Sequence, residues 1–130
     1  MRLIKNIRVL GLGFICSIAL STYTLANEQN ITKKNVPQSI ILSFEKSYPN
    51  AKALNYSKET VKGKTTYEVE SKDGNTKRDL TYSANGQILE IEEVIPLSSL
   101  PKDVIQSLNK SYPKANIVTI EKITKGNNIS

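Results

Sequence analysis

Residue types that commonly carry catalysis are scarce in this sequence, and the carboxylates are the main exception. The chain of 130 residues has no histidine and a single cysteine, Cys16. Without histidine, Ser-His-Asp and Cys-His catalysis and imidazole-bound metal sites are excluded. The 12 acidic residues could hydrolyse a substrate as paired carboxylates, but such a pair needs a cleft. The sequence therefore predicts no catalytic residue, no metal site and no cofactor.

Two turn signals predict how the carboxylates between positions 68 and 92 are arranged. Asp73-Gly74 and Asn85-Gly86 are typical of tight β-hairpins. The first turn gives three expected pairs: Tyr67 with Leu80, Val69 with Arg78, and Glu70 with Lys77. The second turn gives two more: Tyr82 with Leu89, and Leu80 with Ile91. Both hairpins put Leu80 on the same apolar face, and this agreement supports the assignment.

These registers bring acidic side chains together on the outer face of the predicted sheet. Glu68 is expected opposite Asp79, and Asp79 opposite Glu92, in one row across the strands. Like charges directly opposite each other destabilise a sheet. The row is therefore a solvated surface, a docking surface for a basic loop of a partner, or a weak calcium site. The candidate binding residues are Glu68, Glu70, Lys77, Asp79, Glu90 and Glu92.

The elements that would position these strands are repeated along the chain. The stretch FEKSYPNA at 44–51 returns as LNKSYPKA at 108–115, so position 44 is equivalent to position 108. Under the same offset Pro37 meets Pro101. Apolar character is kept where identity fails, as at Val36 and Leu100. The pattern indicates an internal duplication.

Each copy is predicted to open with a helix. Pro37 and Pro101 suit a first helical turn, where no amide donor is needed. Pro49 and Pro113 end the helices, because the residue before a proline avoids the helical conformation. The helix faces and the alternating strand positions give the expected core: Ile40, Ile41, Phe44, Tyr48, Tyr67, Val69, Leu80, Tyr82, Leu89, Ile91, Val104, Ile105 and Leu108.

The predicted fold class is α+β, with one helix packed on a four-stranded antiparallel sheet, followed by a truncated second helix–strand repeat. The second copy has its helix and one strand, 115–124, and reaches KGNNIS where the first copy continues through VKGKTT into its next strand. Either this unit is truncated, or its helix and strand complete the first sheet. A truncated unit would leave the edge of strand 115–124 unpaired, which predicts a homodimer or strand addition to a partner.

Residues 1–26 have the pattern of a secretory signal peptide. Arg2, Lys5 and Arg8 precede an apolar run, and Thr24-Leu25-Ala26 offers small residues for cleavage. Cleavage would remove Cys16; an uncleaved membrane anchor is the alternative. The expected division is a signal peptide at 1–26, a flexible N-terminus at 27–35, a first repeat at 36–99 and a partial second repeat at 100–130. We expect a periplasmic or secreted protein without a membrane span after cleavage.

The basic character of the chain comes partly from this leader. The whole chain has 18 basic and 12 acidic residues, a net charge of +6. Without Arg2, Lys5 and Arg8 the balance is 15 to 12, or +3. The remaining basic residues are mixed with acidic ones and have no aromatic stacking motif, so nucleic-acid binding is not expected.

Four stretches, VPQSIILSFEKSYPNAKAL, YEVESKDG, LTYSANGQILEIEEVIPLSSLP and SYPKANIVTIEKI, resemble the PepSY-like family of secreted bacterial proteins. That family is similar in structure to the tandem repeats of β-lactamase inhibitor protein. The resemblance covers 36–124 and spreads over helix and turn positions. It implies a periplasmic or secreted, non-enzymatic domain without a catalytic motif to transfer.

The sequence thus predicts a module that binds or inhibits a protein partner, of unknown identity, through its sheet surface. The alternative is an envelope-associated structural or self-assembling accessory protein. An enzyme is not expected, because nothing in the sequence provides a cleft for a carboxylate pair.

Overall fold

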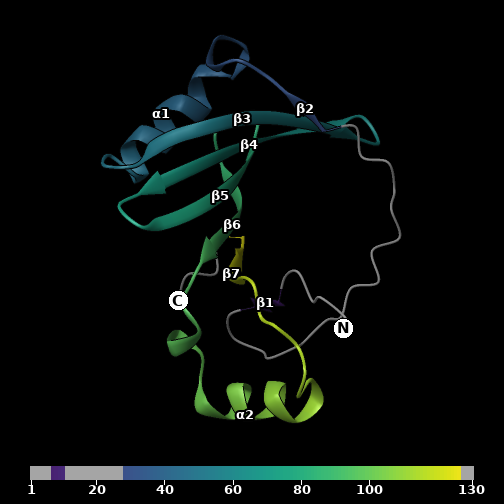
Figure 1. Cartoon of the computed structure of the whole chain (residues 1–130). Coiled ribbons are helices and arrows are strands. Elements are labelled where there is room, and N and C mark those ends of the chain that lie inside the picture. The colour runs from purple at the N-terminus through teal and green to yellow at the C-terminus, as the bar shows by residue number, and fades with distance from the viewer. Residues whose placement is uncertain (1–6, 11–27, 127–130) are drawn as a thin grey trace.

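The structure, a computed structural model, describes residues 7–10 and 28–126 (Figure 1). Its elements in chain order are β1 (Ile7–Leu10), β2 (Gln29–Asn30), η1 (Lys33–Asn35), α1 (Gln38–Ser47), β3 (Lys52–Val61), β4 (Lys64–Asp73), β5 (Thr76–Ser83), β6 (Ile88–Val94), η2 (Leu97–Ser99), α2 (Lys102–Ser111) and β7 (Ile120–Lys125). The short elements η1 and η2 are 3-10 turns.

All the strands form one sheet in the order β1-β7-β6-β5-β4-β3-β2. Strands β2 to β7 pair antiparallel, and β1 pairs parallel to β7. The α+β class is confirmed, but the predicted four-stranded sheet is wrong, because β7 and β2 extend the antiparallel part to six strands. The second helix and strand therefore complete the first sheet, which is one of the two predicted arrangements.

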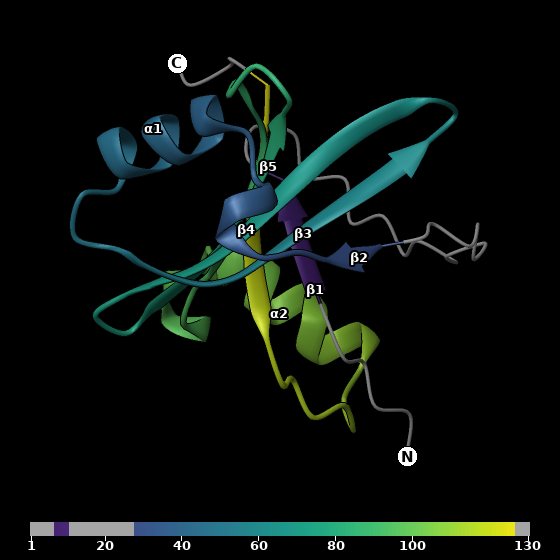
Figure 2. The ribbon, with the colours of Figure 1, turned by 90° about the horizontal axis from the view of Figure 1, so that it is seen from above.

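The sheet is strongly twisted from one end to the other. Figure 1 shows α1 beside β3 and β4, and α2 near the other end of the sheet. In the view from above, β3 and β4 run obliquely to the yellow strand β7 (Figure 2). A twist of the same hand between neighbouring strands accumulates across a sheet of this width. The two helices therefore cover different parts of the sheet.

The predicted ends of the helices are confirmed, and the helices begin just after the prolines that were expected in their first turns. Pro37 and Pro101 immediately precede α1 and α2. Each helix ends before a tyrosine: Tyr48 and Tyr112 have φ near −133° and −135°, outside the helical range. The proline that follows each tyrosine prevents the helix from continuing.

The duplication is present in the backbone as well as in the sequence. The turns η1 and η2 begin at the equivalent positions 33 and 97, and α1 and α2 begin at the equivalent positions 38 and 102. The Ile31 N–H donates to the Tyr56 carbonyl, and the equivalent Ile95 N–H donates to the Ile120 carbonyl, both at 2.9 Å. The pairing of β2 with β3 likewise recurs as the pairing of the end of β6 with β7. We call β2 to β6 the first unit, and the end of β6 to β7 the second unit; β6 belongs to both.

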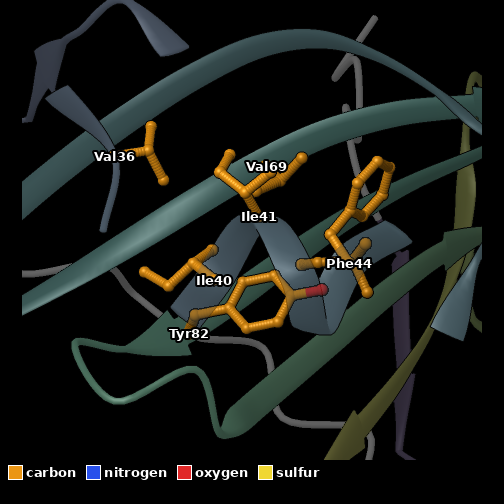
Figure 3. Packing of buried hydrophobic residues seen from close by; sticks show 7 residues of the cluster. Val36, Ile40, Ile41, Phe44, Val69 and Tyr82 are labelled. Atoms are coloured by element: carbon orange, nitrogen blue, oxygen red, sulfur yellow. The ribbon is translucent and has the colours of Figure 1, made fainter. Parts of the chain in front are cut away.

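The main core lies between α1 and the strands of the first unit. Figure 3 shows Tyr82 extending from β5 across the space between Ile40 and Phe44 of α1. Among the predicted core residues, seven are buried: Ile40, Ile41, Phe44, Val69, Leu80, Tyr82 and Leu108. Five more are partly buried and pack against a core: Tyr48, Tyr67, Ile91, Val104 and Ile105. Four buried apolar residues were not predicted: Val36, Leu100, Ile120 and Ile123.

The predicted register of β4 with β5 is wrong by two residues. The tight loop consists of Gly74 and Asn75, rather than Asp73 and Gly74, and Gly74 has a φ of +57°. A glycine in the first loop position is typical of a type II′ hairpin. Moving the loop by one residue shifts every pair by two, so each side chain keeps its face. The observed pairs are Tyr67 with Tyr82, Val69 with Leu80, and Glu70 with Asp79.

The predicted register of β5 with β6 is confirmed away from the turn, where Leu80 pairs with Ile91. The loop itself is one residue longer than expected, because the Ser83 N–H donates to the Gln87 carbonyl at 2.9 Å. The three loop residues are 84–86, and Gly86 at the third position has a φ of +86°. This geometry is the common three-residue hairpin with a bulge.

The longer loop changes which residue of β6 reaches the core. Tyr82 pairs with Ile88 and not with the predicted Leu89, across an irregularity between Thr81 and Tyr82. Ile88 packs against the core in place of Leu89, so the core assignment of Leu89 is wrong. A second irregularity, between Ala53 and Asn55 in β3, leaves Leu54 53% exposed.

Two predicted segments have a different structure from the one expected. The predicted strand 115–124 is shorter, since β7 begins at Ile120. The segment 27–35 contains β2 and η1 from residue 29 onwards. Most of the predicted signal peptide lies outside the described residues, and its described part, 7–10, is β1. Neither α1 nor α2 has the length and apolar character of a membrane span, and the described residues contain no other candidate.

Candidate functional site

Both helices lie on the same face of the sheet. Ile91 of β6 packs into the core under α1 and pairs with Thr124 of β7. Side chains alternate along a strand, so Ile120 shares the face of Thr124. Ile120 belongs to the apolar cluster that includes residues of α2. The opposite face of the sheet, which we call the outer face, therefore carries neither α1 nor α2.

The outer face holds the predicted carboxylates. Val69, Leu80 and Ile91 point to the helix side, so their neighbours in β4, β5 and β6 point away from it. In these three strands the residues on the outer face include three lysines, Lys64, Lys72 and Lys77, and five acidic residues, Glu68, Glu70, Asp79, Glu90 and Glu92. All six candidates thus share one face, as alternation predicts.

The order of the carboxylates differs from the predicted one. Glu70 lies opposite Asp79, which lies opposite Glu92, so the acidic row runs across β4, β5 and β6. Glu68 lies opposite Thr81 and is diagonal to Asp79, not opposite it. The predicted pair of Glu68 with Asp79 is wrong because of the shifted turn, whereas the pair of Asp79 with Glu92 is present.

The fold raises the pKa of two of these carboxyls. Burial is the largest cause, and together with repulsion from Asp79, Glu28, Glu70 and Glu92 it raises the pKa of Glu68 to about 7. Burial also raises the pKa of Asp79, and the Lys77 ammonium acts against this shift. A cluster of partly desolvated like charges is energetically unfavourable in the free protein, which is a common property of binding sites.

Basic residues border the acidic row. Lys77 belongs to the same strand as Asp79 and is exposed. The Lys125 Nζ lies 3.3 Å from a carboxylate oxygen of Glu90 at the β7 side of the face. The described residues contain no group of three histidine, cysteine or acidic side chains arranged to hold a metal ion.

A second charged cluster, on the helix side, was not predicted. The Arg78 Nε donates to the Glu93 carboxylate at 2.5 Å, and the Arg78 guanidinium lies 5.3 Å from the centroid of the Tyr48 ring. Burial raises the pKa of Tyr48. The cluster connects the end of α1 to β5 and β6, so its role is structural. The predicted register of the second hairpin already places Arg78 opposite Glu93, and this pair could have been found from it.

A model of one protein family matches the chain twice, over residues 22–90 and 65–130. The family is described as beta-lactamase-inhibitor-like and PepSY-like. No similarity to a curated protein or to a solved structure is found. The two overlapping matches cover most of the 130 residues. The chain therefore belongs to the PepSY-like, beta-lactamase-inhibitor-like family.

Proposed function

We propose that the chain is a secreted or periplasmic, non-enzymatic module that binds a protein partner through the outer face of its sheet. The observation that supports this most is the acidic row of Glu70, Asp79 and Glu92, with Glu68 beside it, on a face that carries neither helix. Like charges held opposite each other reduce the stability of the free protein. A partner that places basic side chains there would relieve this repulsion.

The family and the leader pattern support the same proposal. The family is described by resemblance to an inhibitor of an enzyme, and an inhibitor acts by binding another protein. A leader cleaved after Ala26 would deliver the chain to the compartment outside the cytoplasm, where the partner would be found. The description of the family makes a β-lactamase the first defined partner to test.

A charge-neutral substitution in the centre of the row tests the proposal. Asp79→Asn removes one charge between Glu70 and Glu92. The free protein should become more stable by about 0.5 kcal/mol, because two like-charge contacts are lost. Binding to a partner should become weaker and less sensitive to salt, since exposed charges are screened over about 10 Å at 0.1 M salt. Urea denaturation measures the first effect, and binding to the immobilised secreted chain measures the second.

Asp103→Asn provides the matched control, because it removes the same charge from the exposed first turn of α2. An acidic residue there interacts favourably with the helix dipole, so this variant should be slightly less stable rather than more stable. It should leave partner binding unchanged. If Asp79→Asn and Asp103→Asn behave alike in both measurements, the acidic row is only a solvated surface.

A further inference from the structure

The backbone of β7 has hydrogen-bonding groups directed away from the rest of the antiparallel sheet. The Ile120 carbonyl accepts from Ile95 at 2.9 Å, and the Gly126 N–H donates to Leu89 at 3.0 Å, so even-numbered residues of β7 pair toward β6. The N–H and C=O groups of alternate residues point in opposite directions in an antiparallel strand. Those of Glu121, Ile123 and Lys125 therefore point to the outer edge of β7.

The first unit shows what fills the equivalent edge. There β3 takes the place of β7, and β4 pairs with it antiparallel from Val61 and Lys64 to Lys52 and Lys72. Side chains of β4 and β5, including Val69, complete the core around α1. As a result Ile40 is 0% exposed and Ile41 is 5% exposed.

The second unit has a thinner core around its helix. Val104 and Ile105 are the equivalents of Ile40 and Ile41 in the duplication, but they are only partly buried. Among the residues whose side chains the structure describes, the cluster that includes α2 draws its members from 95–120 alone. Among the described residues, the second unit thus has the helix and the first strand of the fold, and no antiparallel strands follow β7 as β4 and β5 follow β3 in the first unit.

In the full chain the outer edge of β7 is taken by β1, which pairs parallel to it from Ile7 and Ile120 to Leu10 and Ile123. This edge can therefore pair with an added strand. All four residues of β1 lie within the segment that the sequence predicts to be removed as a signal peptide. Removal of that segment would take β1 away from the edge, and an exposed strand edge readily pairs with another extended chain.

We propose that the outer edge of β7 is a second binding site, which accepts an extended strand from a partner protein in the place that β4 takes in the first unit. Main-chain hydrogen bonds would supply the affinity and the flanking side chains the specificity, as in other cases of strand addition. The inference rests on the proposed function only in requiring that residues 1–26 are removed. It does not require the acidic row to bind anything.

The charges along β7 define the chemistry of that strand. Applying the offset of the duplication to the register of β3 with β4 gives three facing positions: Glu68 meets Glu121, Thr66 meets Ile123, and Lys64 meets Lys125. The sequence of β4 itself would thus place like charges opposite each other twice. A suitable strand instead reads, from its N-terminus, an acidic residue, a β-branched residue and a basic residue at alternate positions. The residues between them, which face α2, correspond to Thr65 and Tyr67 of β4.

Two peptides of identical composition test this assignment. One has the sequence of β4, KTTYEVESKD, and the other, ETTYKVESKD, exchanges its Lys64 and Glu68. The protein is the secreted chain, shown by mass to begin at Asn27 and by circular dichroism to be folded. The exchanged peptide should bind about tenfold more tightly, because two like-charge pairs become two opposite-charge pairs. On binding, amide exchange should slow at Glu121, Ile123 and Lys125, measured residue by residue by NMR.

A double variant provides the reciprocal test. Glu121→Lys with Lys125→Glu reverses both charges of the edge and should bind the β4 peptide more tightly than the exchanged one. Asp79→Asn should leave peptide binding unchanged, so failure of the acidic row as a binding surface is distinguished from failure of this edge.

Three outcomes would overturn the proposal. The first is the absence of saturable binding of either peptide to the processed chain. The second is equal binding of both peptides, or protection of amides elsewhere than on β7. The third is protection of the Glu121, Ile123 and Lys125 amides without peptide in a self-associated chain, because the occupant of the edge would then be a second copy.

Discussion

At the scale of single residues, Glu68 is the carboxyl whose titration the fold moves into the neutral range. Burial, followed by repulsion from Asp79 and its acidic neighbours, raises its pKa from 4.5 to about 7. The folded protein thus holds this proton more tightly than the unfolded chain does. The stability that this group contributes is fully present below about pH 4.5 and is lost as the pH rises through about 7.

Replacement of Glu68 by glutamine should remove this pH dependence. Glu68→Gln cannot ionise, so at about pH 8 the variant should have a higher free energy of unfolding than the unsubstituted chain. The difference should shrink toward about pH 5, where Glu68 is protonated in the folded protein. Urea denaturation at both pH values measures it. Equal stability of the two proteins at the higher pH would show that the carboxylate is not destabilising.

The acidic face was predictable in its membership but not in its internal order. Strand alternation alone assigns Glu68, Asp79 and Glu92 to one face, because every register allowed by an even shift keeps them there. Which carboxylate faces which depends on the loop, because the two loop residues can be either Asp73-Gly74 or Gly74-Asn75. In the structure Gly74 is the first loop residue, and this position sets the register of β4 with β5.

At the scale of elements, α1 is held by the side chains that it inserts into the core. Phe44 is 4% exposed and packs with Tyr48 at a ring-centroid distance of 6.1 Å. Phe44→Ala should cost about 3–5 kcal/mol of unfolding free energy, because it removes a buried ring and leaves a cavity.

The control for this substitution lies on the same helix. Leu42 is 58% exposed. Leu42→Ala should therefore cost only about 0.5 kcal/mol, as expected for a surface position. Similar losses in both variants, measured by chemical denaturation, would contradict the packing of this face.

The β5–β6 loop contacts the start of α1 closely enough to demand glycine. A Cβ on Gly86 would lie 2.6 Å from the backbone oxygen of Ser39, and the Ser39 hydroxyl donates to the Ala84 carbonyl at 2.9 Å. Gly86→Ala should therefore destabilise the protein by about 2 kcal/mol or more, from left-handed strain and from displacement of α1.

Gly74→Ala separates these two causes. Gly74 also has a positive φ, of +57°, but a Cβ there would meet nothing within 4 Å. Only the backbone strain remains, so the loss should be about 1 kcal/mol. Thermal unfolding of the two variants should rank Gly86→Ala as clearly the less stable. The reverse order would mean that the loop does not rest against α1.

The helices were easier to predict than the hairpin ends. A proline on each side fixes the limits of α1 and α2 through local sterics, which depend on adjacent residues only. The β5–β6 turn has one loop residue more than expected. As a result, Ile88 packs against the core in place of Leu89. Local propensity does not distinguish a two-residue loop from a three-residue loop when Ala84, Asn85 and Gly86 fit both.

At the scale of the whole molecule, the extent of the sheet was beyond the reach of sequence patterns. The pairing of β6 with β7 joins Glu90 to Lys125, across a long connection that includes α2. Periodicity predicts a strand near 120 but not its neighbour, so both a separate second unit and a shared sheet agreed with the sequence. In the structure the end of β6 is equivalent to β2, and β7 to β3. The sequence did not indicate this, because the segment that contains β2, 27–35, was expected to be flexible.

The identity of the mature N-terminus decides whether β1 remains part of this sheet. We expect secreted material to begin at Asn27, because Thr24 and Ala26 are small residues at the positions that a signal peptidase reads. Intact-mass analysis of the secreted protein measures this directly. Recovery of a chain that retains residues 1–26 would contradict both the proposed location outside the cytoplasm and the proposal that the outer edge of β7 is open.

The use of β6 by both units also has a consequence for folding. In arrays of discrete repeats, each repeat has its own stability and neighbours are coupled through an interface. Here the coupling is a strand: β6 closes the first unit and opens the second, so neither unit can melt without disturbing a strand that the other unit also uses. Loss of β7 and α2 would expose β6, and loss of β6 would remove a strand to which both units are hydrogen-bonded. The duplicated chain should therefore gain and lose its structure as a single cooperative body.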